Sequence, residues 1–421
     1  MKRNTTHGIP AEKTGNGGKA ALKDLFDKCH KFSRADEAKA LGYYPYFREL
    51  EENEGPEVTI EGKRLVMAGS NNYLGLSVHP EVKKAAVDAI EKYGSTCSGS
   101  RYLNGTLALH HRLEDAIAEF IGVDSCLCFT SGYVTNQGII PTLVGRHEYL
   151  LSDKDNHTSI VAGTLMAKAV GAELIRYKNN DMESLEHSLS KIPLDAGKLI
   201  VSDGVFSMSG IVANVPQIAS LAKKYNARVL IDEAHGFGVV GATGRGTCEL
   251  FNLKPQKDVD LLMGTFSKSF ASLGGFVGGS AKIIDFIKHN AMSFIFSASM
   301  PPANTAAALA SLEIIKREPE RIARLQEIGD YMRKGFRTLG FEIIESTTPI
   351  IPVLVRDDFL TCTFWRRLFE EGVYTNTVVS PAVPPGMQLI RTSYIATTKQ
   401  AQLDFILEKF EKAGKELGLI S

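Results

Sequence analysis

The sequence has no apolar run long enough to cross a bilayer as a helix, and its first residues lack the apolar core of a signal peptide. Its six cysteines show no metal-ligand spacing, so we expect no metal site. No charge of one sign prevails, because 48 lysines and arginines balance 48 aspartates and glutamates. This balance argues against a broad basic field for nucleic acid. Together these absences favour a reduced, cytoplasmic protein.

The chain is long enough, at 421 residues, to form more than one domain, and its 44% hydrophobic residues are ordinary for a globular protein. We expect three parts. Residues 1–62 comprise a tail, a helix and the start of a hairpin, residues 63–300 form a large α/β domain, and residues 301–421 form a smaller α+β domain.

The N-terminal part begins with a polar, glycine-rich stretch over residues 1–20, which predicts a flexible tail. Apolar residues with helical spacing then predict a helix over 21–40. Such a helix could pack on a partner subunit or lie on a membrane surface, and packing on protein is the commoner outcome. A hairpin is expected over 58–67, a helix over 81–93 and a polar loop over 94–106.

Strand and helix patterns alternate from residue 107 to residue 280. Short apolar runs predict strands at 125–129, 149–152, 174–176, 199–202, 228–231 and 259–263, with helices between most of them. Such alternation predicts a mainly parallel sheet that is covered on both faces. Beyond residue 300 the pattern changes to helices at 303–317, 318–338, 358–371 and 398–415, with strands near 341–344, 350–355 and 387–392.

Polar side chains follow five of these expected strands. The segments are Thr130-Ser-Gly-Tyr133, Asp153-Lys-Asp-Asn-His157, Asp203-Gly-Val-Phe-Ser207, Asp232-Glu-Ala-His235 and Gly264-Thr-Phe-Ser-Lys268. The carboxyl ends of parallel strands meet at one edge of a sheet, where such folds bind ligands. We therefore expect these segments to form one crevice.

The side chains in this expected crevice suit pyridoxal phosphate. The cofactor's aldehyde needs an amine such as Lys268, and its pyridine nitrogen needs a buried carboxylate such as Asp232. His157 could stack on the ring and His235 could reach its phenolic oxygen. The phosphate needs a helix start and hydroxyls, for which the sequence offers Ser131, Gly132, Thr265 and Ser267.

A competing motif is Gly236-Phe-Gly-Val-Val-Gly241, which fits the pattern of a dinucleotide site. Its glycines do not follow a strand directly, and the residues after them, up to Thr247, do not predict a helix. Nicotinamide binding is therefore the weaker hypothesis.

The motifs Asp232-Glu-Ala-His-Gly-Phe-Gly238, Asp203-Gly-Val-Phe-Ser-Met208 and Gly264-Thr-Phe-Ser-Lys268 resemble those of the α-oxoamine synthases, which are fold-type I pyridoxal phosphate enzymes. The resemblance runs from about residue 40 to the C-terminus. It implies a mainly parallel seven-stranded sheet in the large domain and a smaller α+β C-terminal domain. Within the family, the chain is most similar to bacterial serine palmitoyltransferases, on segments 99–106, 263–276, 296–300, 349–352 and 379–384.

The resemblance implies roles for the residues around the cofactor ring. Lys268 would form the Schiff base and His157 would stack on the ring. Asp232 would bind the pyridine nitrogen, while His235 and Ser207 would meet the phenolic oxygen.

It also implies roles at the phosphate. Gly132 and Tyr133 would offer backbone donors, and Thr265 and Ser267 would add hydroxyls. Ser299, or its neighbour Ala298, would reach the phosphate of the other subunit, so a homodimer with shared active sites is expected.

Asn72 and Arg391 would hold the carboxylate of the amino-acid substrate. One departure from the family pattern lies shortly after this arginine. The family usually has a histidine where this sequence has Thr397, within Ile395-Ala-Thr-Thr-Lys399.

The reaction that the resemblance implies is a decarboxylative Claisen condensation. An amino acid, expected to be L-serine, would react with a long-chain acyl-CoA, expected to be palmitoyl-CoA. The products would be CoA, CO2 and a 3-keto amine, 3-ketodihydrosphingosine, in the first step of sphingolipid biosynthesis. Alternatives are another family member, such as a glycine C-acetyltransferase or an 8-amino-7-oxononanoate synthase, an aminotransferase, or a non-catalytic partner subunit, which the presence of Lys268 disfavours. The expected location is the cytoplasm, with peripheral contact at the inner face of the membrane left open.

Overall fold

The computed structural model describes residues 24–421, and its contacts divide the chain into units 1–44 and 45–421. The described part of the first unit holds α1 (Asp27–His30) and α2 (Arg34–Ala40). The expected single helix over 21–40 is therefore wrong within the described residues, because the chain leaves helical geometry at 31–33. No side chain of α1 or α2 is buried, and short helices without packing are marginal. The expected tail at 1–20 lies outside the described residues.

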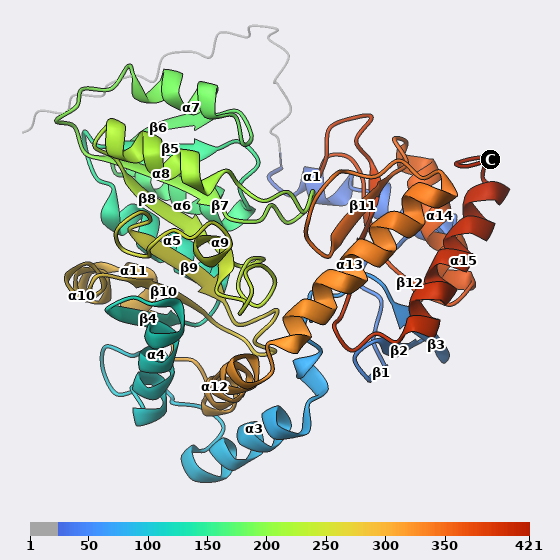
Figure 1. The fold of residues 1–421 in the computed structure, drawn as a ribbon, viewed down its shortest axis with the longest axis horizontal. Helices are drawn as coiled ribbons and strands as arrows, with labels where there is room; N and C mark the ends of the chain where they lie inside the picture. Colours follow the sequence, from blue (N-terminus) through green and yellow to red (C-terminus); the bar gives the residue numbers. More distant parts are fainter. Residues whose placement is uncertain (1–23) are drawn as a thin grey trace, which may run out of the picture. The chain divides into compact units, whose positions relative to one another are not determined.

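The central sheet of the second unit has seven strands in the order β4-β10-β9-β8-β7-β5-β6 (Figure 1). β10 pairs antiparallel with β4 and β9, and the pairs from β9 across to β6 are parallel. Six carboxyl ends therefore lie at one edge, and the predicted mainly parallel, seven-stranded sheet is confirmed. The strands are β4 (Ser125–Phe129), β5 (Tyr149–Asp153), β6 (Glu173–Tyr177), β7 (Lys198–Asp203), β8 (Arg228–Asp232), β9 (Leu261–Thr265) and β10 (Gly275–Gly279).

Strand β10 has no counterpart in the sequence-based prediction, because glycine-rich segments have low strand propensity. Its glycines serve close packing. A Cβ at Gly278 would lie 2.6 Å from the Ile121 side chain and 2.8 Å from Cys126 Sγ. Ile121 and strand β4 therefore pack directly on the backbone of β10 at this glycine.

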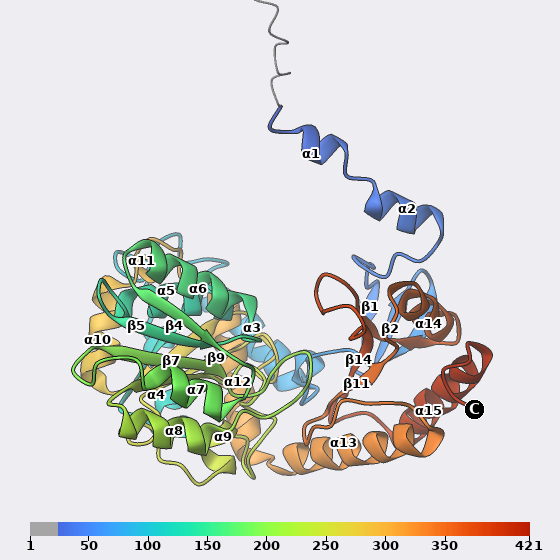
Figure 2. The same cartoon turned by 90° about the horizontal axis from the view of Figure 1, so that it is seen from above.

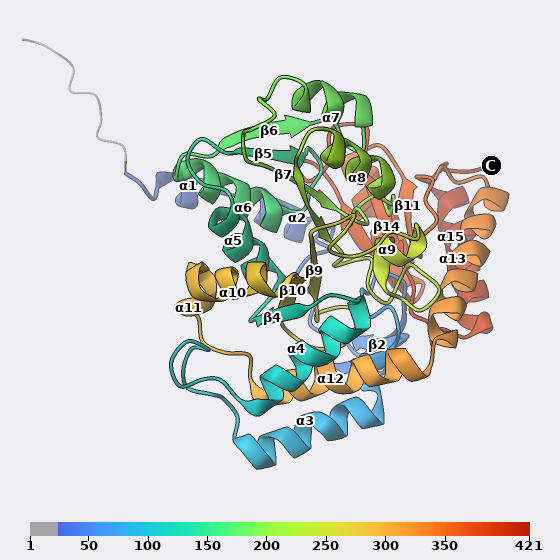
Figure 3. The same ribbon diagram turned by 60° about the vertical axis from the view of Figure 1, so that its left-hand side comes forward.

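Helices cover both faces of this sheet (Figure 3). A hydrophobic core lies between the helices and the sheet on each face. Along β4, Cys126 and Cys128 belong to one core, whereas Leu127 and Phe129 belong to the other. The first core is closed by helices that include α3 (Pro80–Tyr93), α4 (Ala108–Ile121), α7 (Met182–Leu189), α8 (Val215–Lys224), α9 (Gly246–Leu250) and α12 (Pro302–Arg317). The second is closed by α5 (Gly132–Leu143), α6 (Thr158–Ala169), α10 (Ala281–Asn290) and α11 (Met292–Ile295).

A third core joins the hairpin near residue 60 to the C-terminal part of the chain (Figure 2). Its two small sheets have the orders β1-β2-β3-β12 and β11-β14-β13. The elements are β1 (Glu52–Asn53), β2 (Glu57–Ile60), β3 (Lys63–Met67), α13 (Glu320–Leu339), β11 (Ile350–Leu354), α14 (Asp358–Glu370), β12 (Val373–Tyr374), β13 (Asn376–Val378), β14 (Leu389–Ser393) and α15 (Gln400–Glu416). The hairpin prediction is confirmed. The division of the chain at residues 62 and 300 stays a prediction.

The expected strand at 341–344 is wrong. Ile343 makes an isolated bridge to Val353, and the pairing then stops. The chain turns back after Ile343, where Ser346 Oγ donates to the carbonyl of Ile350. A turn so close to the bridge leaves no length for a ladder.

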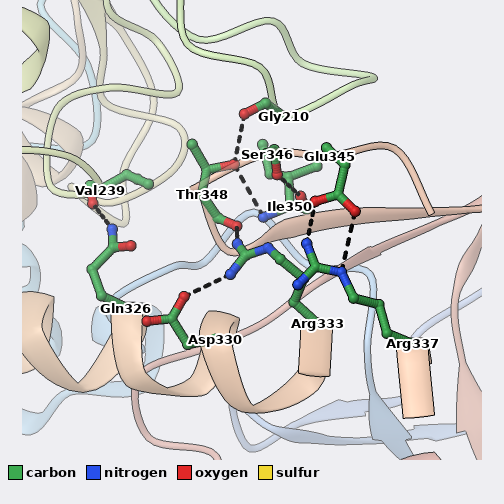
Figure 4. A network of polar contacts seen from close by, with 10 residues as sticks. All are labelled: Gly210, Val239, Gln326, Asp330, Arg333, Arg337, Glu345, Ser346, Thr348 and Ile350. Atoms are coloured by element: carbon green, nitrogen blue, oxygen red, sulfur yellow. Dashed lines mark hydrogen bonds and ion pairs between the residues drawn. The ribbon is translucent and has the colours of Figure 1, made fainter. Parts of the chain in front are cut away.

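Helix α13 is bonded to loops that are far from it in the sequence (Figure 4). The buried guanidinium of Arg333 donates to the Thr348 carbonyl at 2.6 Å and pairs with Asp330. Thr348 Oγ1 in turn donates to the Gly210 carbonyl at 2.9 Å. Gly210 lies within the loop that follows β7, so these contacts connect the start of β11 to a loop at the carboxyl edge of the large sheet.

Candidate active site

A cavity of about 240 Å³ lies at the carboxyl edge of the large sheet. The structure brings together there most of the residues expected from the strand ends. Those that line the cavity are Ser131, Gly132, Tyr133, His157, Asp232, His235, Thr265, Ser267 and Lys268. The predicted crevice therefore exists, whereas Ser207, Ser299, Asn72 and Arg391 are not among its lining residues.

One end of the cavity has the features of an anion cradle. Ser131 caps α5 by accepting a hydrogen bond from the Val134 N–H at 3.1 Å, which leaves the first backbone N–H groups of the helix facing the cavity. The hydroxyls of Thr265 and Ser267 lie 2.9 Å apart beside this helix start. A Cβ on Gly132 would come within 2.9 Å of Thr265 Cβ, so the close approach requires glycine. These donors fit a phosphate.

Asp232 ends β8 and is buried below the cavity. Its Oδ1 accepts the Ala234 N–H at 2.9 Å, and its Oδ2 accepts Nδ2 of Asn136 at 2.7 Å. Two donors hold this carboxylate with lone pairs to spare for a further N–H, as a protonated pyridine nitrogen would offer. Asn136 was missed from the sequence, because it lies mid-helix on α5 with no local signal of function.

The amine of Lys268 lies in the field of two carboxylates. Burial lowers the pKa of this amine to about 8, although the charges of Asp232 and Asp203 act to raise it and that of Arg391 lowers it further. A lysine amine with a pKa near neutrality is available both as a nucleophile and as a base. The donor set and this amine fit pyridoxal phosphate.

His157 caps α6 and is anchored through its backbone. Its N–H donates to Asp203 Oδ2 at 2.8 Å, and its Nδ1 accepts the Ser159 N–H at 3.2 Å. Burial raises the pKa of Asp203, and the nearby Asp232 raises it further. Burial also lowers the pKa of His157, which favours a neutral imidazole at physiological pH.

His235 belongs to a second cluster at the side of the cavity. Its Nδ1 lies 2.7 Å from the hydroxyl of Tyr73, a fully buried residue that sequence reasoning missed. Burial holds the pKa of His235 well below its ordinary value, and the charges of Lys268 and Arg391 lower it further, so the ring stays neutral. A neutral ring that accepts at Nδ1 from Tyr73 carries its proton on Nε2.

Arg391 lies on β14 and completes this second cluster. It donates through Nε to the Ser207 carbonyl at 2.7 Å and through Nη2 to Asn71 Oδ1 at 3.1 Å. The side chain of Asn72 is bonded instead to Ser77. Of the two asparagines in the loop at 69–76, the structure places Asn71 against the arginine, whereas the resemblance implied Asn72. The roles proposed for Asn72 and Ser207 stay predictions.

Ser299 is packed against the polar loop at 94–106. Its backbone N–H and its hydroxyl both donate to the Gly99 carbonyl, at 2.9 and 3.0 Å. The neighbouring Ala298 is exposed. Contact of either residue with another subunit stays a prediction.

The glycines of the competing dinucleotide motif lie too close to other side chains to carry a Cβ. A Cβ at Gly236 would collide with the buried carboxyl group of Glu233, one at Gly238 would lie 2.5 Å from Ser269 Cβ, and one at Gly241 would lie 2.3 Å from Glu249 Oε2. The segment 236–241 forms turns and does not begin a helix. The glycines are therefore explained by packing, and the dinucleotide hypothesis loses its structural basis.

The mainly parallel sheet, the lysine at its carboxyl edge and the phosphate cradle define the class of fold-type I pyridoxal phosphate transferases. Residues 64–410 match the family aminotransferase class I and II, and the chain belongs to this family.

Several known proteins of this family are similar to the chain over almost its whole length. A serine palmitoyltransferase of Bacteroides ovatus is 47% identical over 94% of this chain and 99% of its own length. An 8-amino-7-oxononanoate synthase of Thermosipho melanesiensis is 41% identical over 94% of this chain and 100% of its own. The solved serine palmitoyltransferase of S. paucimobilis with a bound pyridoxal phosphate–myriocin aldimine has a TM-score of 0.90 and 34% identity, over 94% of this chain and 100% of that one. The predicted resemblance is confirmed.

Proposed function

We propose that this protein catalyses the pyridoxal phosphate-dependent condensation of L-serine with palmitoyl-CoA, which yields 3-ketodihydrosphingosine, CoA and CO2. The observation that carries the proposal is the cavity in which Lys268, Asp232 and His157 converge beside a phosphate cradle. The predicted cofactor and the acyltransferase class are confirmed by the relatives, since serine palmitoyltransferases match over almost the whole chain.

The residues that would hold the cofactor divide by its parts. Lys268 would attach its aldehyde, Asp232 would bind its ring nitrogen, and the start of α5 with Thr265 and Ser267 would bind its phosphate. When bound, the group supplies an electron sink for negative charge that forms on the amino acid's α-carbon.

The chain's own side chains would bind the amino acid and move its proton. Arg391 is buried beside the cavity, and we propose it as the cation that binds the serine carboxylate, with Asn72 as the predicted second contact. The Lys268 amine, with a pKa of about 8, takes the proton from the α-carbon. His157 lies at the cavity and would cover the ring face, which excludes water from that side.

We also propose that the active enzyme is a homodimer. Large apolar side chains near Ser299 are exposed in the single chain, with Leu103 at 78% and Phe296 at 76%. The loop that carries Leu103 is held rigidly, because Arg101 forms a buried bidentate pair with Glu114 at 2.8 and 2.9 Å. A second copy would cover these side chains. Sedimentation velocity on the full chain measures the assembly, and a monomer at micromolar concentration would contradict it.

The first unit offers a separate surface. Leu25, Phe26 and Phe32 are 70%, 61% and 63% exposed. No helix among residues 24–421 is long and apolar enough to cross a membrane. We propose that this unit docks on the partner subunit, with peripheral membrane contact in the cytoplasm as the alternative. Co-sedimentation with anionic vesicles tests the alternative, and a protein that stays in the supernatant rejects it.

An assay of CoA release tests the reaction. The purified protein is incubated with serine, glycine or alanine against acyl-CoAs of two to eighteen carbons, and the product is identified by mass. We expect the highest kcat/KM with serine and palmitoyl-CoA. Highest activity with alanine and pimeloyl-CoA would favour the 8-amino-7-oxononanoate synthase alternative, and no CoA release with any pair would overturn the proposal. The Lys268→Ala variant should release no CoA, and Lys288→Ala, which changes an exposed lysine, is its matched control.

A further inference from the structure

Asn136 lies on α5 and is fully buried between two groups of the candidate site. Its side-chain amide has two N–H donors. One donates to Asp232 Oδ2 at 2.7 Å, and the other donates to Ser159 Oγ at 2.9 Å. Both N–H groups are therefore hydrogen-bonded, one to Asp232 and the other to Ser159, which lie at different parts of the cavity.

The second donor reaches His157 through Ser159. Because Ser159 Oγ accepts from Asn136, its own hydrogen is free to donate to His157 Nδ1, 2.8 Å away. The Ser159 N–H donates to the same nitrogen. With Nδ1 occupied as an acceptor, the neutral imidazole of His157 carries its proton on Nε2.

We propose that Asn136 is a positioning residue that couples the carboxylate below the cofactor ring to the imidazole beside it. This inference rests on the proposed function. The first donor fixes the orientation of the Asp232 carboxylate and favours its charged form, because a hydrogen bond donated to a carboxylate stabilises the charge. The second fixes the ring orientation and tautomer of His157. One amide therefore sets two contacts that the cofactor would need.

The location of Asn136 explains why this role needs an amide. A hydroxyl has one donor and could serve Asp232 or Ser159 but not both. Helix α5 also packs closely on α6 at this point, since a Cβ at Gly163 would lie 2.6 Å from the backbone carbonyl oxygen of Asn136.

The test compares Asn136→Leu, which keeps the approximate shape of the side chain but has no donor, with Thr164→Val. Thr164 is also buried, on α6, and its hydroxyl bonds within its own helix. The full-length apoproteins are titrated with pyridoxal phosphate, and the visible absorbance of the bound cofactor gives its Kd. We expect a ten- to hundredfold weaker Kd for Asn136→Leu, the effect of about one hydrogen bond to a charged group, and a Kd within threefold of wild type for Thr164→Val.

The Ser159→Ala variant separates the effect of the hydrogen bond to Asp232 from the effect of the link to His157. It also provides a test if Asn136→Leu does not fold. It leaves the Asn136–Asp232 bond in place but breaks the link to His157. We expect a cofactor Kd within threefold of wild type and about a tenfold lower kcat at unchanged KM for serine.

The outcomes distinguish this inference from the proposed function. If wild-type protein binds pyridoxal phosphate and Asn136→Leu binds it with the same Kd, the positioning role of Asn136 is overturned but the proposed function is not. A Ser159→Ala protein with wild-type kcat would overturn the coupling to His157. Wild-type protein that gives no visible band would overturn the proposed function and this inference with it.

Discussion

The candidate site has two halves that are built in different ways. The strand-end half holds Lys268, Asp232 and His157 on loops that leave one parallel sheet. The arginine corner holds Arg391 from β14, with Tyr73 and Asn71 from the loop at 69–76. The first half follows from the order of strands along the chain, whereas the second exists only because distant segments pack together. We expect substitutions in the strand-end half to change cofactor binding and the reaction rate, and substitutions in the arginine corner to change the affinity for serine.

The largest expected effect in this comparison comes from Asp232→Asn. Loss of the charge below the ring nitrogen removes the electrostatic support for negative charge at the reacting carbon, so kcat should fall by about a hundredfold or more. Steady-state kinetics with serine and palmitoyl-CoA measure the change. Asp258→Asn, which alters a half-buried carboxylate that is paired with Lys223, should leave kcat unchanged. A small effect on kcat at position 232 would contradict the assignment.

The next effect concerns the arginine corner. Arg391→Ala removes the buried cation proposed to bind the serine carboxylate, and serine binding should weaken about ten- to hundredfold. Cofactor Kd should remain within threefold, because Arg391 contacts Ser207 and Asn71 and is not among the cavity-lining residues. Titration with serine, followed by the cofactor's absorbance, separates the two. A matched loss of cofactor affinity would show that the halves are not independent.

A third effect is pH dependence within the strand-end half. The Lys268 amine has a pKa lowered to about 8 by burial, and only its neutral form reacts with an aldehyde. The rate of cofactor loading into apoprotein should therefore rise with pH through about 8, from roughly a tenth of its plateau at pH 7. Stopped-flow absorbance measures this rate. A rate that does not change between pH 7 and 9.5 would contradict a lowered pKa.

The smallest expected effect concerns the hydrogen bond between Thr348 and Gly210, which supports the arginine corner. Thr348→Val removes the hydroxyl that donates to the carbonyl of Gly210, which lies in the same loop as Ser207 (Figure 4). A lost buried hydrogen bond of this kind costs about 1 kcal/mol of unfolding free energy, and KM for serine should rise a few-fold. Thr363→Val, on α14, is the control. If KM stays constant while stability falls, the contact is structural only.

The sequence predicted the two halves unequally, for a physical reason. Lys268, Asp232 and His157 each follow an apolar run, and parallel strands bring such positions to one edge regardless of side-chain detail. Tyr73 and Asn136 carry no comparable signal, because a tyrosine in a polar loop or an asparagine on a helix acquires its partner only through packing. The position of Asn71 beside Arg391 depends in the same way on how β14 meets the loop at 69–76.

The helices and strands were also predicted unequally, according to whether their sequence carries a local pattern or depends on packing. Strands and helices with a clear apolar period were predicted within a few residues, and β10 was missed because its packing uses glycines. The helix over 21–40 was predicted from spacing alone, yet a periodic pattern without a surface to bury it breaks into α1 and α2.

The most direct test of the central claim is to locate the bound cofactor on the chain. The holoprotein is reduced with borohydride, digested and mapped by mass spectrometry, with Lys268→Ala as the control. We predict a pyridoxyl group on Lys268 and on no other lysine, and no reduced adduct in the variant. An adduct on a different lysine, or an adduct that persists in Lys268→Ala, would contradict the assignment of the strand-end half as the cofactor site.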